Sequence, residues 1–132
     1  MTDPALYAAE IAAVNAAVQT WFNGTDEAGF LDRLMARFSD DCSVVLPDGT
    51  QLDKAALRDI FAARAGQRPQ LRIVITEIAV IADWESGAVA TFIEHQDDGA
   101  GNRNARRSTA LFSRATDGTL QWRRLHETFF RE

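Results

Sequence analysis

Residues 71–82 read LRIVITEIAVIA, a run rich in Ile and Val in which both alternating sets of side chains are largely apolar. Such a strand is typical of burial on both faces of a sheet. Three more segments of strand composition follow, at residues 88–96, 106–115 and 120–130. The turns between them are short and contain Gly next to Asp, Glu or Ser, which predicts hairpins. The second half of the chain therefore predicts a largely antiparallel sheet.

The residues before this sheet predict helices. Residues 4–22 carry an apolar stripe of helical period, and Asp3 can cap its first turn. A second helix is expected at about residues 26–38. A third begins after Asp53, its expected N-cap, and ends before Gly66. The first half of the chain is therefore mainly helical.

A short strand is expected at residues 42–46, where CSVVL is followed by the turn Pro47-Asp48-Gly49. The order helix, helix, strand, helix and four strands is typical of an α+β fold. Three N-terminal helices on one face of a curved, mainly antiparallel sheet would make a cone with a cavity inside. The opposite sheet face would stay apolar and exposed, so we expect a homodimer through the sheet face.

Composition excludes several classes of protein. The chain has 132 residues, a net charge of −5 and 46% hydrophobic residues, which predicts one soluble domain over residues 1–132. No apolar run approaches the ~20 residues of a membrane span, and the start has no basic signal region. The acidic balance argues against a nucleic-acid partner. A single cysteine, Cys42, is not typical of a secreted scaffold, so a cytoplasmic location is expected.

The charge is distributed unevenly along the chain. Residues 1–60 hold 10 acidic and 4 basic side chains, whereas residues 61–132 hold 9 acidic and 10 basic side chains. All the basic residues of the second part are Arg, whose planar guanidinium suits carboxylates. An anionic ligand is therefore an expectation for the cavity.

Three segments carry a family resemblance: FSDDCSV at residues 38–44 before the Pro-Asp-Gly turn, the helix containing Leu57 and Phe61, and QWRRLHETF at residues 121–129. Together with the order of elements, they resemble the NTF2-like superfamily of SnoaL-like or DUF4440-type domains. The resemblance implies a cone-shaped fold. It leaves the function open, since this fold hosts isomerases, dehydratases, epoxide hydrolases, polyketide cyclases and non-catalytic binding or oligomerisation modules.

Residue-by-residue comparison with three catalytic branches of that superfamily gives no match. Ketosteroid isomerases place a general-base Asp before the Pro of the first strand, where this chain has Leu46. Scytalone dehydratases use two strand histidines, and His95 and His126 are available. The strand between them, residues 106–115, carries no His, so the arrangement of that family is not reproduced. Epoxide hydrolases need an Asp–Arg–Asp relay, whereas the Asp residues here cluster in turns.

Four aromatic residues are predicted to form the cavity wall: Trp21, Phe38, Phe61 and Trp122. Packing in the core explains these residues equally well. Aromatic rings in a small cone favour an apolar ligand with a ring. No His, Cys or carboxylate pair has the spacing of a metal motif, so no metal or other cofactor is expected.

The polar candidates lie on the strands. Arg107 is preferred over Arg106 as a ligand-binding residue, and His126 is a second ligand-binding candidate. His126 or Glu94 could serve as an acid–base residue, because imidazole titrates near neutral pH and an apolar cone raises the pKa of a carboxylate. Alternation places Trp122 and His126 on one face of the last strand, and leaves open which face lines the cavity.

Three functions remain possible from the sequence. The leading hypothesis is a homodimer whose cavity binds a small apolar or carboxylate-bearing molecule. The alternatives are a cyclase, isomerase or dehydratase that uses His126 or Glu94, and an oligomerisation module without a ligand.

Overall fold

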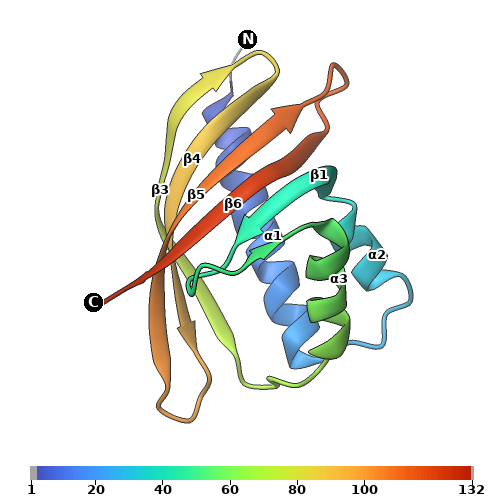
Figure 1. The fold of residues 1–132 in the computed structure, drawn as a ribbon, viewed down its shortest axis with the longest axis vertical. Helices are drawn as coiled ribbons and strands as arrows, with labels where there is room; N and C mark the ends of the chain where they lie inside the picture. Colours follow the sequence, from blue (N-terminus) through green and yellow to red (C-terminus); the bar gives the residue numbers. More distant parts are fainter. Residues whose placement is uncertain (1–2, 132) are drawn as a thin grey trace.

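A computed structural model describes residues 3–131 of the chain (Figure 1). Helices and strands follow the expected order except for the two-residue strand β2, which was not predicted: α1 (Pro4–Asn23), α2 (Phe30–Met35), β1 (Phe38–Val45), β2 (Gln51–Leu52), α3 (Lys54–Ala63), β3 (Arg72–Trp84), β4 (Gly87–Asp97), β5 (Arg103–Arg114) and β6 (Leu120–Phe130). The strands form one six-stranded sheet in the order β2-β1-β6-β5-β4-β3. Only β1 and β6 are parallel among these pairs. The α+β architecture with a mainly antiparallel sheet is confirmed.

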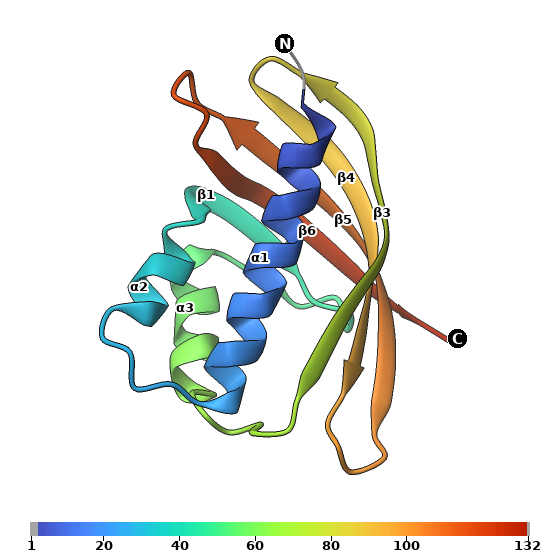
Figure 2. The same cartoon turned by 180° about the vertical axis from the view of Figure 1, so that it is seen from behind.

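The sheet is strongly curved, and all three helices lie on the side toward which it bends (Figure 2). α1 runs along the inner face beside β3, and α2 and α3 stand next to β1. This arrangement leaves the outer face of the sheet without a covering layer. None of the helices in the described part of the chain is long and apolar enough to cross a membrane.

Local sequence explains where the helices begin and end. The Asp53 carboxylate accepts a hydrogen bond from the backbone N–H of Ala56 at 2.9 Å, so the expected N-cap of α3 is confirmed. Asp3 precedes α1, but its side chain makes no capping hydrogen bond. α2 is shorter than expected, because Gly29, at φ 77°, precedes its first residue and β1 already begins at Phe38.

A bulge in β3 explains why both alternating sets of its side chains are apolar. The register with β4 shifts between Thr76 and Ala79, and Glu77 has a φ of 54°. Ile73 and Ile75 pack against the core before this shift, and Ile78 and Val80 do so after it. The inward side chains are therefore odd-numbered before the bulge and even-numbered after it, so apolar residues occur in both alternating sets.

The prediction that β3 is buried on both faces is wrong for the single chain. β3 is an edge strand in which no residue is buried. Val74 is 48% exposed and Ile81 is 61% exposed. The inner set alone packs on the core, and the outer set remains accessible.

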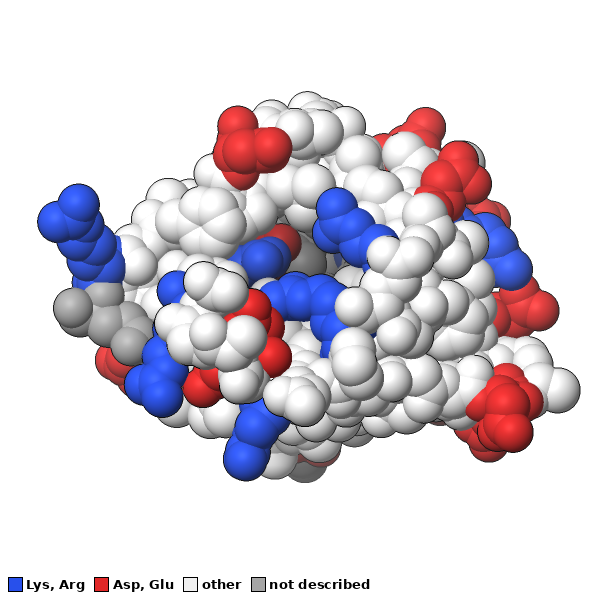
Figure 3. Space-filling model, turned by 90° about the horizontal axis from the view of Figure 1, so that it is seen from below, with Lys and Arg blue, Asp and Glu red and all other residues white. Residues whose placement is uncertain are grey.

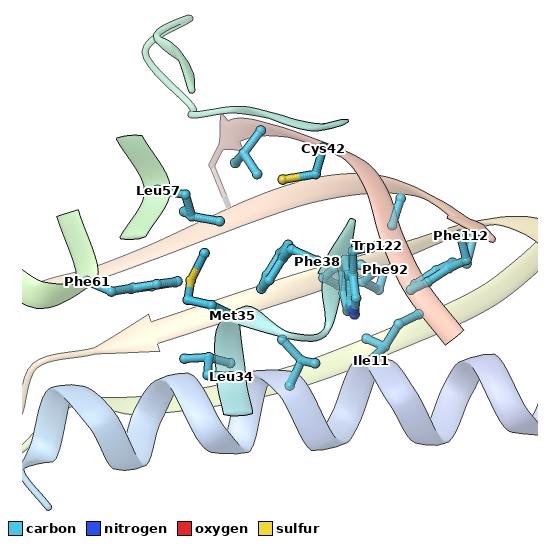
Figure 4. Packing of buried hydrophobic residues seen from close by; sticks show 14 of the residues in the cluster. Ile11, Leu34, Met35, Phe38, Cys42, Leu57, Phe61, Phe92, Phe112 and Trp122 are labelled. Carbon is cyan, nitrogen blue, oxygen red and sulfur yellow. The ribbon is translucent and has the colours of Figure 1, made fainter. Parts of the chain in front are cut away.

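The main core lies between α1 and the sheet, where Phe38, Phe92, Phe112 and Trp122 gather (Figure 4). Trp122 is 1% exposed, and its ring meets that of Phe112 edge-on with centroids 4.7 Å apart. Its indole N–H donates to the Glu10 carboxylate of α1 at 3.1 Å. Trp122 therefore joins the last strand to the first helix.

Candidate functional site

A cavity of about 120 Å³ lies between the helices and the inner face of the sheet. Most of its lining is apolar and comes from α1, α3 and four strands: Val14, Val18, Phe22, Phe38, Val44, Leu46, Leu52, Leu57, Ile60, Phe61, Phe92, Trp122 and Leu125. An apolar cavity of about 150 Å³ is known to hold one benzene ring. This cavity is therefore close to the size of a single ring.

A band of polar side chains lines the same cavity. It consists of Asn15, Arg64, Arg68, Glu94, Gln96, Arg106 and Glu127. Glu94, Gln96 and Glu127 are each 6% exposed. Buried carboxylates are rare unless partners satisfy them, so their contacts determine what the cavity can do.

The polar band begins where the inner side chains of β4 and β6, the strands on either side of β5, change from apolar to polar. On β4 the inner side is Phe92, then Glu94 and Gln96 toward the β4–β5 hairpin. On β6 it is Trp122, then Leu125 and Glu127 toward the C-terminus. The apolar part of the cavity thus lies at one end of these strands, and the charged part at the other.

Hydrogen bonds connect this band in two short chains. Arg68 donates through Nη1 to Gln96 Oε1 at 3.2 Å, and Gln96 donates through Nε2 to Glu94 Oε2 at 2.5 Å. On the neighbouring strands, Arg106 Nη1 lies 3.4 Å from Glu127 Oε1 and 3.3 Å from Oε2. Glu94 and Arg106 are register partners on β4 and β5. Two buried carboxylates, Glu94 and Glu127, therefore lie close to one guanidinium group, that of Arg106.

Burial raises the pKa of Glu127 to about 7, and the nearby charge of Glu94 adds to the rise. Arg106 acts in the opposite direction without restoring the ordinary pKa. A carboxyl group with this pKa exchanges its proton near neutral pH, so it can donate or accept a hydrogen bond.

Basic side chains surround the opening of the cavity. Seen from below, the surface has a hollow flanked by Lys and Arg side chains (Figure 3). Arg64, Arg68 and Arg106 belong to the cavity lining. Within residues 3–131, neither Arg64 nor Arg68 forms an ion pair with a carboxylate. Arg64 therefore has no ion pair in the described part of the chain, whereas Arg68 donates to Gln96 and its charge contributes to the lowered pKa of Asp98.

Four residues predicted for the site line the cavity: Phe38, Phe61, Trp122 and Glu94. Leu46, at the position of the isomerase base, also lines the cavity. An apolar side chain therefore occupies the position where ketosteroid isomerases have their general base. Trp21 is not part of the lining. Its indole N–H donates to the carbonyl of Phe61 at 2.7 Å and its ring stacks on Phe30, so Trp21 supports the wall from behind.

Arg107 and His126 are placed elsewhere. His126 is exposed, and the Arg107 guanidinium lies 4.4 Å from the centre of the Phe130 ring; neither residue lines the cavity. A register shift in the β5–β6 pair beside Trp122 puts Trp122, Leu125 and Glu127 on one face. His126 therefore points to the other face, and the structure does not bring it together with Glu94.

Glu127, Gln96 and Arg68 were not predicted from the sequence, and the preference for Arg107 over Arg106 is not supported by the lining. One signal was available, since Phe92, Glu94 and Gln96 alternate on β4 and so share a face. Glu127 had no such signal, because the bulge breaks its alternation with Trp122.

Other chemistry finds no support in the described residues. Residues 3–131 contain no group of three or more His, Cys, Asp or Glu side chains that could hold a metal ion. Cys42 is 4% exposed, and burial raises the pKa of its thiol, which disfavours the reactive thiolate. The carboxylate–arginine band is therefore the most reactive feature of the cavity.

The chain is similar to known domains. The model of the SnoaL-like domain family matches residues 11–129. An NTF2-like protein of unknown function from Pseudomonas aeruginosa is 41% identical, with a TM-score of 0.92 over 96% of this chain and 99% of that chain. A search of curated proteins found no match.

More distant structures share the fold alone. An NTF2-like protein of unknown function in nutrient uptake from Rhodospirillum rubrum is 20% identical, with a TM-score of 0.71 over 98% of this chain and 100% of that chain. A ketosteroid isomerase-like protein from Erwinia carotovora atroseptica is 16% identical, with a TM-score of 0.59 over 92% and 95% of the two chains.

Proposed function

The chain belongs to the SnoaL-like domain family of the NTF2-like superfamily, and from this premise we propose that its cavity binds a small, mostly apolar molecule with a carboxylate group. One observation carries the proposal: the lining of an apolar cavity of about 120 Å³ includes Arg64 and Arg68, which form no ion pair with a carboxylate among residues 3–131. An apolar group fits the closed part, and a carboxylate fits the opening.

The charges of the lining support an anion over a cation. Arg64, Arg68 and Arg106 contribute three positive charges, against the two carboxylates Glu94 and Glu127. The pKa of about 7 for Glu127 reduces the negative charge further at neutral pH. A carboxylate at the opening meets arginines first and lies away from the buried glutamates.

The test is a binding comparison between 4-phenylbutanoate and the neutral 4-phenylbutan-1-ol. At about 0.3 kcal/mol per non-hydrogen atom, a ligand of this size binds with a Kd of about 1 mM, within the range of ligand-observed NMR. We expect the carboxylate to bind about tenfold more tightly than the alcohol. Arg68→Gln should remove most of this difference, because a hydrogen bond between charged groups contributes about 1.5–3 kcal/mol.

Arg72→Gln is the matched control, since Arg72 is exposed on β3 and does not line the cavity. Val18→Phe, which fills the cavity from α1, should abolish binding of both molecules while circular dichroism shows a folded protein. Equal binding of both molecules, or binding unaffected by Val18→Phe, would contradict the proposal. If neither molecule binds, the result would favour the oligomerisation module without a ligand.

We also propose that the chain forms a homodimer through the outer face of its sheet. This face has a hollow of about 580 Å³ whose lining includes Thr91, Ile93, Arg107 and Thr109. Its edge exposes Val74 and Ile81. Exposed apolar surface of this kind favours a protein contact. The expected cytoplasmic location stays a prediction.

An acid–base enzyme is the second candidate function. Glu94, which the sequence predicted as an acid–base residue, lines the cavity with Glu127, whose pKa is about 7. A suitable test is deuterium exchange at the carbon next to the ketone of 3-benzoylpropionate, followed by NMR in D₂O. Exchange that depends on protein and is lost in Glu94→Gln and Glu127→Gln would support the enzyme.

A further inference from the structure

Glu94 is a buried carboxylate whose charge no side chain balances within residues 3–131. It is 6% exposed and forms no ion pair in that range. The only side-chain hydrogen bond of Glu94 there joins its Oε2 to the amide of Gln96, at 2.5 Å. The Arg106 guanidinium, on the neighbouring strand, is instead paired with Glu127 at 3.3 Å. A buried carboxylate of this kind is costly unless a further donor or a positive charge meets it.

One oxygen of Glu94 is accessible from the cavity. Oε2 takes the bond from Gln96, and no hydrogen bond reaches Oε1 in the described part of the chain. The fully enclosed side-chain oxygens without a partner in that part belong to Tyr7, Asp83 and Ser108, so Oε1 of Glu94 is not fully enclosed. Because Glu94 lines the cavity, a bound molecule can reach this oxygen.

The neighbours of Glu94 determine which part of a ligand it meets. Phe92 lies on its apolar side along β4, and on its other side Gln96 accepts a hydrogen bond from Arg68 at 3.2 Å. That bond uses one of the five N–H donors of the guanidinium, so other donors remain for an anion. Only the amide of Gln96 therefore separates a positive group from the negative Glu94. A cationic group beside Glu94 and an anionic group beside Arg68 would be close neighbours in one molecule.

We propose that the ligand is an apolar α-amino acid whose ammonium group donates a hydrogen bond to Glu94. Such a molecule carries its ammonium and its carboxylate on the same carbon, which fits the placement of Glu94 and Arg68 on either side of Gln96. Its side chain enters the apolar part of the cavity, whose volume of about 120 Å³ is close to that of one ring. This inference rests on the proposed function and adds a specificity-determining residue to it.

The balance of charge in the cavity favours a ligand with both charges. Arg106 and Glu127 pair with each other, which leaves Glu94 together with Arg64 and Arg68. A ligand with only a carboxylate leaves Glu94 without a counter-ion, and a ligand with only an ammonium leaves the two arginines without an anion. An α-amino acid supplies both groups, and each of them forms a hydrogen bond with a charged side chain, which is stronger than one between neutral groups.

The experiment compares the two enantiomers of phenylalanine with 3-phenylpropanoate, which has a hydrogen in place of the ammonium group. Ligand-observed NMR titrations at neutral pH would measure each Kd. We expect the tighter-binding enantiomer of phenylalanine to bind about tenfold more tightly than 3-phenylpropanoate, because its ammonium adds a hydrogen bond between charged groups. 3-Phenyllactate, which has a neutral hydroxyl at the same carbon, should bind with an affinity between the two.

Glu94→Gln is the decisive variant, since it removes the negative charge and keeps the shape of the side chain. It should lower the preference for phenylalanine to about threefold or less, because a hydrogen bond to a neutral acceptor is roughly half as strong. Its affinity for 3-phenylpropanoate should stay the same or increase, whereas a purely structural role of Glu94 would weaken both ligands equally. Glu85→Gln, in an exposed turn, is the matched control and should keep the wild-type preference. If circular dichroism shows Glu94→Gln to be unfolded, the three ligands on the wild-type protein still decide the inference.

The remaining outcomes separate this inference from the proposed function. If phenylalanine and 3-phenylpropanoate bind the wild type equally, the inference fails and the proposed function stands. A preference that persists unchanged in Glu94→Gln, or 3-phenyllactate binding as tightly as phenylalanine, would also overturn the inference, because the charge of Glu94 would then have no role. If no carboxylate binds, 4-phenylbutanoate included, the proposed function itself fails. If 2-phenylethylamine binds more tightly than phenylalanine, the carboxylate has no role and both proposals fail.

Discussion

Glu127 shows how one side chain links the stability of the fold to its function. It is 6% exposed and lies near Glu94, another buried carboxylate. Its pKa is raised from 4.5 to about 7, so the folded state binds this proton more tightly than the unfolded state. Its contribution to stability is therefore fully present below pH 4.5 and is lost as the pH rises through 7.

We predict that Glu127→Gln flattens the pH dependence of stability. A raised pKa of this size corresponds to up to ~3 kcal/mol of unfolding free energy, lost by the wild type between about pH 5 and 8. Glu127→Gln should lose much less over this range, because its amide does not ionise. Urea denaturation at several pH values measures the difference. Equal pH slopes in the two proteins would contradict it, and Glu85→Gln should behave as wild type.

At the scale of elements, the sequence predicts an Asp N-cap for both α1 and α3, but only one of the two side chains makes the capping hydrogen bond. Asp53 caps α3 with a hydrogen bond to the N–H of Ala56, whereas the Asp3 side chain makes none at α1. α3 supplies Leu57, Ile60 and Phe61 to the cavity wall. The start of α3 therefore supports the site as well as the fold.

We predict that Asp53→Ala lowers the free energy of unfolding by ~1 kcal/mol, the usual value of an N-cap hydrogen bond. Asp3→Ala should change it by less than about half of that. Chemical denaturation of the two variants is the measurement. Equal losses would mean that the capping bond of Asp53 adds no stability.

Two irregularities in strands decide which side chains face inward, toward the core on β3 and toward the cavity on β6. The shift at Glu77 turns Ile78 and Val80 inward on β3, and the shift beside Trp122 does the same for Leu125 and Glu127 on β6. Each adds one residue to one strand of a pair and so reverses the alternation beyond it. Glu127 belongs to the polar band because of the second shift.

At the scale of the whole molecule, the open question is what covers the outer sheet face. Thr109 lies at its centre, paired with Thr91 on one side and with His126 on the other. In a symmetric dimer this surface meets its own copy, so residues near the two-fold axis lie opposite themselves.

We predict that the wild-type chain has the mass of a dimer in light scattering at micromolar concentration. Thr109→Arg should shift it to a monomer, because two added charges would oppose each other beside Arg107. Thr116→Arg, in the exposed β5–β6 turn, is the control and should leave the dimer intact. A wild-type monomer would contradict the proposed interface, and a dimer that tolerates Thr109→Arg would place the contact elsewhere.

Much of the architecture could be predicted from local sequence. The order of helices and strands, the turns of β3–β6 and the N-cap of α3 each depend on residues close together in the chain. The resemblance to the NTF2-like superfamily, carried by residues 38–44 and 121–129, is confirmed by the family match over residues 11–129. The short α2 was not foreseen, because the pairing of Phe38 with Trp122 is a long-range contact.

The candidate site was predicted only in part. Phe38, Phe61, Trp122 and Glu94 line the cavity as expected, since apolar residues on helix and strand faces point inward by periodicity. His126 and Arg107 lie on the outer face, and Glu127 and Arg106 take the inner positions. On β6 the added residue exchanges the faces of His126 and Glu127. On β5 no residue is added between Arg106 and Phe112, so regular alternation places Arg106 on the inner face and Arg107 on the outer face.

The sequence by itself therefore determined the order of the main elements through short-range periodicity, and it indicated the family through a resemblance that the family match confirms. Of the predicted aromatic wall, Phe38, Phe61 and Trp122 line the cavity, and Trp21 does not. Only the tertiary structure decided which charged side chains lie inside. For Glu127 that choice depends on the register shift in β6, because the added residue reverses the alternation after Trp122. Two carboxylates and an arginine thus meet in one cavity although 33 positions separate Glu94 from Glu127 along the chain.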